Sequence, residues 1–328
     1  MRTYSIKAFG QPEVFREMEL PIPELLPGHI LIRVKATSIN PVDYKIRAGV
    51  LPELSPAFPA VLHGDVAGVI EAISEGITKL QVGDEVYACA GGIQGLHGAL
   101  AELMLADAAL VAKKPMSLSF SEAAALPLVS ITAWEGLIER AQVQPGQRVL
   151  VYGGTGGVGQ IGIQLAKWRG AKVFATISSP EKAQIAKQLG ADDVIDYQRQ
   201  SVEDYIQQYT DGQGFDIVLD TVGNDNLQSA FQAAKPNGQV VSILALSTQD
   251  LTPMHVRGLT LHIVYMLMPM LSGLNRAEHS EILTKIAAIV DTGQIRPLVA
   301  QVFSVSNIAQ AHRYAESGQA VGKVVVEW

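Results

Sequence analysis

The sequence predicts an α/β protein of two domains, in which a doubly wound parallel sheet domain is inserted into a β-rich, barrel-like domain. The chain of 328 residues is too long for one ordinary core. Its first third holds short β-type runs, and from about Ser121 helix and strand patterns alternate. We therefore assign residues 1–124 and 268–328 to the β-rich domain and residues 125–267 to the inserted domain.

Three runs predict the strands of the first third: HILIRVKATSI, VAGVIEAI and DEVYACA. Gly, Pro and Asp residues separate them, as turns between short strands require. Near the C-terminus, one amphipathic helix carries its apolar side chains on a single face, at Ile282, Leu283, Ile286, Ile289 and Val290. The strand-like ending GKVVVEW follows this helix, and we expect it to rejoin the first domain.

The middle of the chain begins with the helical segment SEAAALPLVSITAWEGLIE. Strand and helix patterns then alternate through DDVIDY, FDIVLDTV, LQSAFQAAK and QVVSILAL. This alternation is typical of a doubly wound parallel sheet.

A glycine-rich turn joins the first strand of this sheet, RVLVY, to a helix that starts at Val158, and the second strand, KVFATI, follows. Gly153, Gly156 and Gly159 lie three residues apart, so the backbone can turn tightly and approach a pyrophosphate at the helix N-terminus. A packing turn without a ligand is the alternative. We predict a Rossmann-type dinucleotide site with these contacts: Gly153, Thr155, Gly156, Gly157, Val158 and Gly159.

The end of the second strand bears on the choice of cofactor. A free ribose 2′-hydroxyl usually meets an acidic residue there, but this chain has no carboxylate before Glu181. Ser178 and Ser179 offer hydroxyls and Lys182 offers a positive charge, which suits the 2′-phosphate of NADPH. Ser179 as a helix N-cap before Pro180 would need no ligand, and both functions are compatible.

Composition excludes several classes of function. The net charge is −7 and no Lys/Arg-rich run occurs, which argues against nucleic-acid and anionic-membrane partners. No apolar segment reaches about 18 residues and the first residues lack a signal-peptide core, so we expect a soluble, cytoplasmic protein. The single cysteine, Cys89, excludes an internal disulfide, and we expect it to be a small buried residue.

The whole chain resembles the medium-chain dehydrogenase/reductase superfamily, in its zinc-free quinone oxidoreductase and enone reductase branch. The resemblance is carried by SINPVDYKIRAG, DVAGVIEAIS, VGDEVYA, LPLVSITAWEGL, GGTGGVG and GKVVV, in that order. It implies a GroES-like catalytic domain around a Rossmann domain. It also implies that NADPH delivers hydride to a quinone or an α,β-unsaturated carbonyl in a cleft between them.

The chain departs from the zinc-dependent relatives at the metal site. Asn40 stands where those relatives have Cys, Gly64 where they have His, and the Cys of the LPLVSITAW region is missing. Catalytic zinc needs three protein ligands and an open position, so we predict no metal. A shifted site of His63, Asp65 and Asp43 is an alternative, but carboxylates compete poorly with N and S ligands for zinc. The other histidines show no ligand spacing.

Without a metal, the reaction needs an electron-poor acceptor and hydrogen-bond donors at the oxygen that takes the charge. In NPVDYKIRAG the candidate donors are Asn40, Tyr44 and Lys45, with Asp43 as an orienting partner. Resemblance to plant-type enone reductases favours Lys45. Each residue also has an ordinary alternative: a turn at Asn40, barrel packing at Tyr44 and a solvated surface charge at Lys45.

Further cofactor contacts follow from the fold and the resemblance. Loops after later parallel strands share the carboxyl edge of the sheet with the glycine turn. Asp220, at one of these strand ends, is either a cap or a cofactor contact. The resemblance implies that Thr132 and Lys323 reach the cofactor from the domain junction. The remaining predicted contacts are Tyr197, Thr221, Val222, Ile243 and Leu244.

The segment LTLHIVYML, residues 259–267, predicts the last strand of the sheet and is apolar at nearly every position. An unguarded apolar edge favours pairing with the same strand of a second subunit, so we expect a homodimer, unless a helix of the same chain covers it. Two other functions stay open. One is a non-catalytic NADPH-binding or sensing protein, and the other is a zinc alcohol dehydrogenase with unusual ligands.

Overall fold

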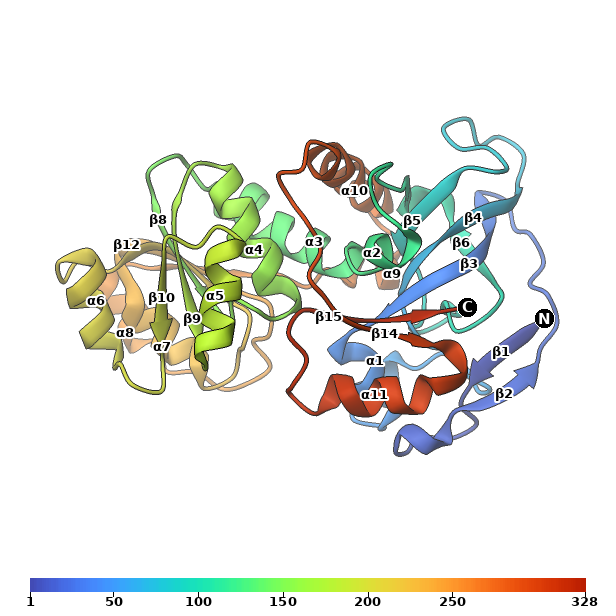
Figure 1. Ribbon diagram of the computed structural model, residues 1–328, viewed down its shortest axis with the longest axis horizontal. Helices are drawn as coiled ribbons and strands as arrows, with labels where there is room; N and C mark the ends of the chain where they lie inside the picture. The colour runs from blue at the N-terminus through green and yellow to red at the C-terminus, as the bar shows by residue number, and fades with distance from the viewer. The chain divides into compact units, whose positions relative to one another are not determined.

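The computed structural model describes residues 1–328 and divides into two compact units. The β-rich unit contains Met1–Ile131 and Leu267–Trp328, and the nucleotide unit contains Thr132–Met266. Figure 1 shows the elements of each. Ala125–Ile131 therefore lies with the β-rich unit, whereas the sequence prediction places it with the inserted domain. The reason is tertiary: the preceding helix packs on the strands of this unit, and the Leu128 amide donates to Asp65.

A seven-stranded sheet forms the framework of the β-rich unit, in the order β14-β15-β3-β4-β5-β7, with β6 also paired to β3. A separate pair joins β1 and β2. The chain's last strand pairs with β3, so the ending GKVVVEW does rejoin the first domain, as predicted. The strands are β1 Arg2–Ser5, β2 Arg16–Glu19, β3 His29–Ile39, β4 Asp65–Ile73, β5 Glu85–Cys89, β6 Leu103–Asp107, β7 Val111–Lys113, β14 Val299–Ser304 and β15 Lys323–Glu327.

The helices of the β-rich unit surround this sheet. The five apolar residues predicted to share one face of the C-terminal amphipathic helix are all buried in α10. The helical segment from Ser121 is broken at Pro127, because proline lacks an N–H and restricts the residue before it. The helices are α1 Pro41–Arg47, α2 Phe120–Ala124, α3 Pro127–Trp134 (which continues into the nucleotide unit), α9 Met268–Ser272, α10 Arg276–Asp291 and α11 Ile308–Glu316.

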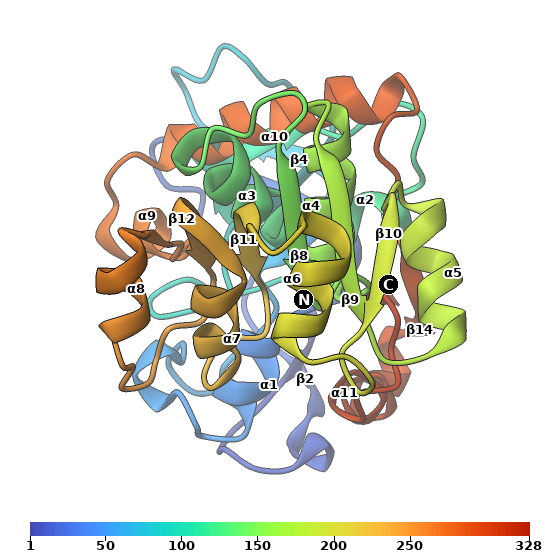
Figure 2. The ribbon, with the colours of Figure 1, turned by 90° about the vertical axis from the view of Figure 1, so that its left-hand side faces the viewer.

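A six-stranded parallel sheet forms the centre of the nucleotide unit, in the order β10-β9-β8-β11-β12-β13. Helices α4 and α5 pack beside β8, β9 and β10, and α7 packs on β11 and β12 with α6 and α8 beside it (Figure 2). This is the predicted doubly wound arrangement. Its elements are β8 Arg148–Tyr152, α4 Gly157–Trp168, β9 Lys172–Ile177, α5 Pro180–Gln188, β10 Asp193–Asp196, α6 Val202–Thr210, β11 Phe215–Asp220, α7 Asn226–Ala233, β12 Ala234–Ser242, α8 Thr252–Arg257 and β13 Thr260–Ile263.

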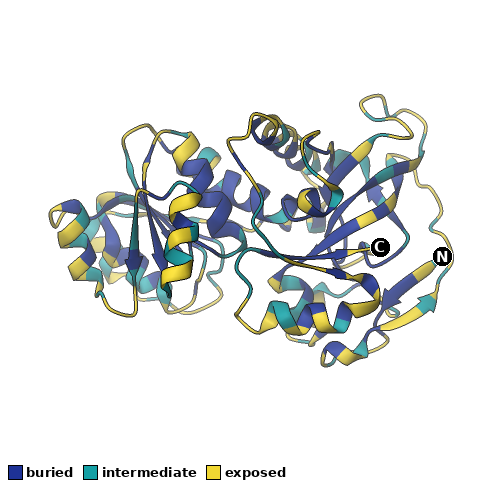
Figure 3. Cartoon of the chain, viewed as in Figure 1, coloured by how far each residue is buried: buried dark blue, intermediate teal, exposed yellow.

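The four inner strands of the nucleotide unit, β9, β8, β11 and β12, are mostly buried (Figure 3), because helices cover the sheet. Phe174, Tyr205, Phe215 and Phe231 fill the core between the sheet and its helices. A π-helical segment, Glu135–Arg140, continues α3. No helix of the structure is both long enough and apolar enough to cross a membrane.

The last strand of this sheet is shorter than predicted. Residues 259–267 do not form one strand, because β13 ends at Ile263 and the chain then turns inward. The Val264 amide donates to Ser242 O at 2.9 Å, and the Val264 and Met266 side chains are buried. Residues 264–267 therefore turn apolar side chains into the protein rather than to solvent. β13 itself remains the edge strand of the sheet.

Candidate functional site

The candidate cofactor contacts of the nucleotide unit lie at one edge of its sheet. The chain runs from β8 outward to β9 and β10, and then returns to β11 on the other side of β8. Open α/β sheets bind ligands at such a reversal, beyond the carboxyl ends of the strands. The segments that follow β8, β9, β10, β11 and β12 contain every candidate contact of this unit except Thr132, which is buried in α3.

The glycine turn after β8 has the backbone geometry that a pyrophosphate site requires. Gly153 has φ +67°, and its amide donates to Thr176 Oγ1 at 3.0 Å. Gly156 is the N-cap of α4 and provides no side chain to cap it, so the first-turn amides are open to an anion. A Cβ on Gly159 would lie 2.2 Å from Gly153 O, so only glycine allows the helix to approach the turn this closely.

A short polar cluster follows β9. Lys182 Nζ donates to Ser178 Oγ at 3.1 Å, and Ser179 Oγ accepts from the Lys182 amide at 3.3 Å. Ser179 is thus the N-cap of α5, with Pro180 in its first turn. The capping function that the sequence left as an alternative is present, and it leaves the Lys182 ammonium beside the Ser178 hydroxyl, where a phosphate can be bound.

The loops after β10, β11 and β12 complete this edge. Tyr197 is 56% exposed, so its ring is available to a ligand. Thr221 Oγ1 donates to Tyr152 O at 2.6 Å, and Val222 is exposed. Ile243 and Leu244 are half-buried after β12.

Asp220 is buried at the end of β11 and acts as a turn cap. Its Oδ1 accepts from the Val222 and Gly223 amides at 3.1 and 3.0 Å and from Asn226 Nδ2 at 2.8 Å. These bonds shape the loop that carries Thr221 and Val222. Asp220 therefore acts on the candidate site through the backbone of this loop.

In the β-rich unit, Asn40 and Asp43 form the N-terminal cap of α1. Asp43 Oδ2 accepts from the Asn40 amide at 2.7 Å, in a capping box. Burial raises the pKa of the Asp43 carboxyl to about 7, and the neighbouring Asp65 adds to this, against the hydrogen bonds from backbone amides and the charge of Lys323. Asp43 is therefore an orienting group that holds a proton over part of the neutral range.

Asp65 is the centre of a buried polar network beside this cap. Its Oδ2 accepts from Ser38 Oγ and from Asn40 Nδ2, both at 2.7 Å, and its Oδ1 accepts from the Leu128 amide at 2.9 Å. Lys323 Nζ lies 3.5 Å from the same carboxylate. Burial lowers the pKa of Lys323, and Asp65 and Asp43 oppose this shift. The Lys323 ammonium is thus hydrogen-bonded within the β-rich unit, and the cofactor contact that the resemblance implied for it stays a prediction.

Tyr44 and Lys45 are the two candidates with free polar ends. Both are half-buried on α1, and neither the Tyr44 hydroxyl nor the Lys45 ammonium has a hydrogen-bond or ion-pair partner. Burial, together with the charges of Glu316 and Asp43, raises the pKa of Tyr44, so its hydroxyl stays protonated and can donate. These two side chains can donate to a substrate oxygen, whereas Asn40 and Asp43 are engaged in the network.

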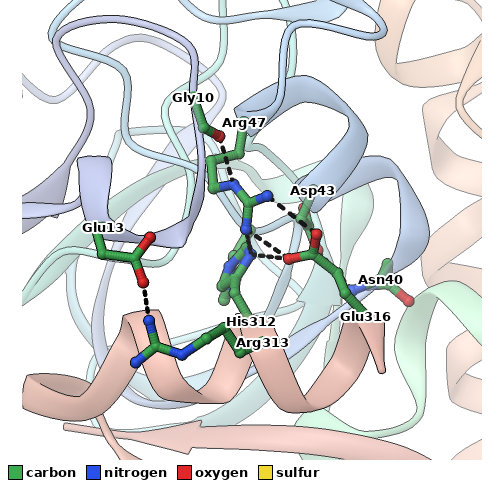
Figure 4. Close-up of polar contacts among 9 residues, drawn as sticks. Gly10, Glu13, Asn40, Asp43, Arg47, His312, Arg313 and Glu316 are labelled. Atoms are coloured by element: carbon green, nitrogen blue, oxygen red, sulfur yellow. Dashed lines mark hydrogen bonds and ion pairs between the residues drawn. The ribbon is translucent and has the colours of Figure 1, made fainter. Parts of the chain in front are cut away.

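A series of hydrogen bonds connects α1 to α11 (Figure 4) and continues through His63 to Thr37 of β3. Arg47, at the end of α1, pairs with Glu316 and donates to Gly10 O and His312 Nδ1. His312 Nε2 and His63 Nε2 are 2.9 Å apart, and His63 Nδ1 lies 3.3 Å from Thr37 Oγ1. Both histidines are fully buried.

The two end groups of this hydrogen-bond series, Arg47 and Thr37, determine the tautomers of His312 and His63. Arginine only donates, so His312 Nδ1 accepts and its Nε2 carries the proton. Thr37 Oγ1 donates to Asp65 O, so it accepts from His63 Nδ1–H, and His63 Nε2 accepts from His312. The pKa of His63 is lowered to about 3 by burial and by Lys323, and that of His312 is lowered well below its ordinary value by burial, His63 and Arg47. Both rings are therefore neutral.

Comparison with known proteins gives matches over the whole chain. Residues 26–116 match the alcohol dehydrogenase GroES-like domain, and residues 189–326 match a zinc-binding dehydrogenase domain. A 2-methylene-furan-3-one reductase of Solanum lycopersicum is 35% identical over 99% of this chain and 79% of its own length. An NADPH-dependent alkenal/one oxidoreductase of Arabidopsis thaliana is 33% identical over the same shares. A human quinone oxidoreductase is 29% identical over 99% of this chain and 97% of its own length.

The chain belongs to the quinone and enone reductase branch of the medium-chain dehydrogenase/reductase superfamily.

Solved structures agree with this assignment. A member of the alcohol dehydrogenase superfamily from Novosphingobium aromaticivorans has a TM-score of 0.95 and 38% identity, with both chains covered completely. A mycobacterial protein in complex with NADPH has a TM-score of 0.89 and 27% identity, again over both whole chains. The predicted combination of a Rossmann domain and a GroES-like domain is therefore confirmed.

The zinc of other superfamily members does not fit the residues present. Asn40 and Asp65 hydrogen-bond each other, and His63 Nε2 is 2.9 Å from His312 rather than directed at them. No three His, Cys, Asp or Glu side chains lie close enough together to hold a metal ion. Cys89 is buried in β5, and burial raises the pKa of its thiol, so the thiol is protonated. The shifted site of His63, Asp65 and Asp43 is not formed.

Sequence reasoning missed part of this reductase's site. Asp65 was considered only as a shifted zinc ligand, although its motif was among the landmarks, and His312 was given no role. Both act through residues far away in sequence, so no local spacing signals them. Thr176, which accepts from the Gly153 amide, was likewise missed.

Proposed function

We propose that the protein is an NADPH-dependent reductase that transfers hydride to a quinone or an α,β-unsaturated carbonyl without zinc. The observation that carries the proposal is the edge of the nucleotide sheet. There the open α4 N-terminus and the Ser178–Lys182 pair lie on neighbouring segments with no carboxylate at the end of β9. The activities named for the relatives support it.

Different residues of the nucleotide unit would bind different parts of NADPH. The α4 N-terminus with Gly153, Thr155 and Gly156 would hold the pyrophosphate, because its amides are open and its dipole favours an anion. Ser178 and Lys182 would bind the 2′-phosphate, with Tyr197 beside them. Bound NADPH supplies the hydride. The remaining proposed contacts are Thr132, Gly157, Val158, Gly159, Ser179, Thr221, Val222, Ile243 and Leu244.

The β-rich unit would stabilise the charge that hydride addition creates on the acceptor oxygen. An enone or quinone carries this charge to an oxygen through conjugation, so hydrogen-bond donors can replace a metal ion. Tyr44 and Lys45 are the donors that have no partner within the chain. Asn40, Asp43 and Asp65 keep α1 in place and do not contact the substrate in this proposal.

The test is steady-state oxidation of NADPH with three acceptors: but-3-en-2-one, 1,4-benzoquinone and the saturated ketone butan-2-one. We expect turnover with the first two and none with the ketone, before and after dialysis against a chelator. Reduction of the ketone that chelation abolishes would instead indicate a zinc alcohol dehydrogenase. NADPH binding without turnover of any acceptor would indicate a binding or sensing protein.

Exchanging Lys182 for Glu tests the cofactor choice. We expect Lys182→Glu to weaken NADPH binding by about 100-fold and NADH binding by less than about three-fold, because the new carboxylate repels only the 2′-phosphate. Calorimetry with both cofactors measures this. Lys187→Glu, on the same helix, is the matched control and should change neither affinity. Equal losses for NADPH and NADH would remove Lys182 from the phosphate site.

We further propose a homodimer formed through β13. One side of this strand pairs with β12, and the other has no partner in the chain. Ile263 and Tyr265 are 41% and 45% exposed, and no proline or lysine protects the strand. Antiparallel pairing about a two-fold axis would satisfy the open amides.

Proline at Ile263 tests this interface. The Val264 amide donates inward to Ser242 O, and successive amides of a strand point to opposite sides, so the Ile263 amide points outward. Ile263→Pro should therefore raise the dimer dissociation constant by at least about ten-fold while leaving the β12 pairing intact. Ile263→Thr, which keeps the amide, should remain dimeric in sedimentation experiments. A wild-type monomer at micromolar concentration would contradict the proposal.

A further inference from the structure

The ammonium of Lys323 lies among three oxygen acceptors inside the β-rich unit. Its Nζ donates to Ile39 O at 2.9 Å and to Asn40 Oδ1 at 2.5 Å, and it lies 3.5 Å from Asp65 Oδ2. The side chains of Lys323 and Asp65 are 3% and 0% exposed. An ammonium has three N–H donors, so these acceptors, which we call the oxygen cage, use all of them.

The oxygen cage joins segments that are far apart in the chain. Ile39 ends β3, Asn40 caps α1, Asp65 begins β4, and Lys323 begins β15. The cage is itself held in place, because Asn40 Nδ2 and Ser38 Oγ both donate to Asp65 Oδ2. One cation therefore neutralises the buried Asp65 carboxylate and at the same time orients the Asn40 amide.

We propose that Lys323 is a positioning residue whose ammonium acts as the tethered cation of this cage and thereby fixes α1, the helix that carries Tyr44 and Lys45. The Asn40 amide donates to Asp43 Oδ2, and the Asn40 carbonyl accepts from the Asp43 amide, so a displaced Asn40 would change the direction of the first turn of α1. The effect on turnover rests on the proposed function, whereas the existence of a cation site does not.

Removing the tether should leave an empty site for a small cation. Lys323→Ala deletes the atoms of propylammonium, so added propylammonium chloride should fill the cage and raise the melting temperature of this variant by about 3 °C or more. Tetramethylammonium has the same charge and no N–H donors, and it should have no such effect. The wild-type protein, with a filled cage, should respond to neither salt specifically.

Equal responses to the two salts, or no response of the variant, would overturn the cation site. If Lys323→Ala does not fold in the absence of salt, its refolding yield in the two salts gives the same comparison. This measurement needs no substrate, so it decides on the cage even if the protein turns over no acceptor.

Turnover tests the effect on α1. We expect Lys323→Ala to lower kcat with an enone by about 30-fold. Added propylammonium should raise the kcat of this variant again by at least about ten-fold. The NADPH dissociation constant should stay within about three-fold of the wild-type value. The matched control is Lys114→Ala. Lys114 is also buried and bonded to carbonyls, at Pro115 and Leu118, but lies outside the network. This control should keep kcat within about two-fold.

Two outcomes would contradict the positioning role. An unchanged kcat in folded Lys323→Ala would show that α1 does not depend on the cage. NADPH affinity lost in parallel with kcat would show that Lys323 contacts the cofactor instead. Absence of turnover in the wild-type protein would overturn the proposed function. The melting temperatures in the two salts would then still test the oxygen cage.

Discussion

We expect the protein to lose stability steeply as the pH falls below about 6.5, the ordinary pKa of histidine. In the folded chain, His63 and His312 share one hydrogen bond and have no room for a further proton between them. A proton on His63 Nε2 would face the proton of His312 Nε2 at 2.9 Å, and one on His312 Nδ1 would face the Arg47 guanidinium. The folded state therefore excludes both protons, which the unfolded chain takes up.

The sign of this effect follows from proton linkage. Between pH 6.5 and the lowered folded pKa of about 3 for His63, the unfolded state binds more protons, so the free energy of unfolding falls with the pH. Each histidine contributes about 1.4 kcal/mol per pH unit, or about 2.8 for the pair. Two pH units thus cost about 5 to 6 kcal/mol, which is comparable with the whole stability of a domain.

Asp43 acts in the opposite direction. Its pKa is raised to about 7 in the folded protein, so between pH 7 and its ordinary value of 3.8 the folded state binds the extra proton. Acidification through this range therefore stabilises the fold by about 1.4 kcal/mol per pH unit through Asp43. The two histidines outweigh this single group, and the net effect remains a loss of stability.

A double substitution isolates the histidine contribution. His63→Gln with His312→Gln removes both titrating rings, and the other groups then cancel in the comparison with the wild-type protein. We expect the difference in unfolding free energy, measured by urea denaturation, to change by about 2.8 kcal/mol per pH unit between about pH 6 and pH 4.5 and to be constant above about pH 7.5. Parallel curves down to about pH 4.5 would contradict the assignment of a neutral pair.

We expect Gly156→Val to abolish NADPH binding, with a loss of at least about 100-fold in affinity, and to leave the nucleotide unit folded. Gly156 has φ −77°, which valine can adopt, and a Cβ there would meet only Gly153 O at 3.2 Å. The branched side chain would stand at the α4 N-terminus, where the pyrophosphate would approach. Calorimetry measures the binding, and thermal unfolding measures the fold, which should lose only about 1 kcal/mol as an N-cap changes from glycine to valine.

Gly159→Ala is the contrasting variant. Its Cβ would lie 2.2 Å from Gly153 O, so α4 and the turn would have to separate, and we expect a large loss of stability. NADPH binding that survives in folded Gly156→Val would show that the pyrophosphate does not lie at this helix end.

The nucleotide unit could be predicted almost element by element because its signals are local. The strands RVLVY and KVFATI, the turn between them and the helix stop at Gly170 depend on neighbouring residues, and the structure confirms each of them. The same holds for β3, whose bounds His29–Ile39 match the predicted run. Two strands differ from their predicted runs: β12 spans Ala234–Ser242 rather than residues 239–246, and β13 ends at Ile263, where the inward turn at Val264 depends on a bond to Ser242.

The polar centre of the β-rich unit could be predicted only in part. NPVDYKIRAG predicted the candidate donors, but neither the helix α1 on which they lie nor which of its side chains are free. Asn40 is engaged because the pairing of β3 with β4 and β15 brings Asp65 and Lys323 to it, whereas Asp43 accepts from the Asn40 amide within the helix cap. Tyr44 and Lys45 have no partner within the chain and remain the open donors.

The sequence by itself determined the two-domain α/β fold, the dinucleotide turn and the absence of the family's zinc ligands, since each depends on residue type at short spacing. Only the tertiary structure decided the direction of Lys323, the central place of Asp65 and the neutral His63–His312 pair. Their partners lie up to 284 residues apart, and a buried charge or ring takes its protonation state and orientation from whichever groups the fold places against it.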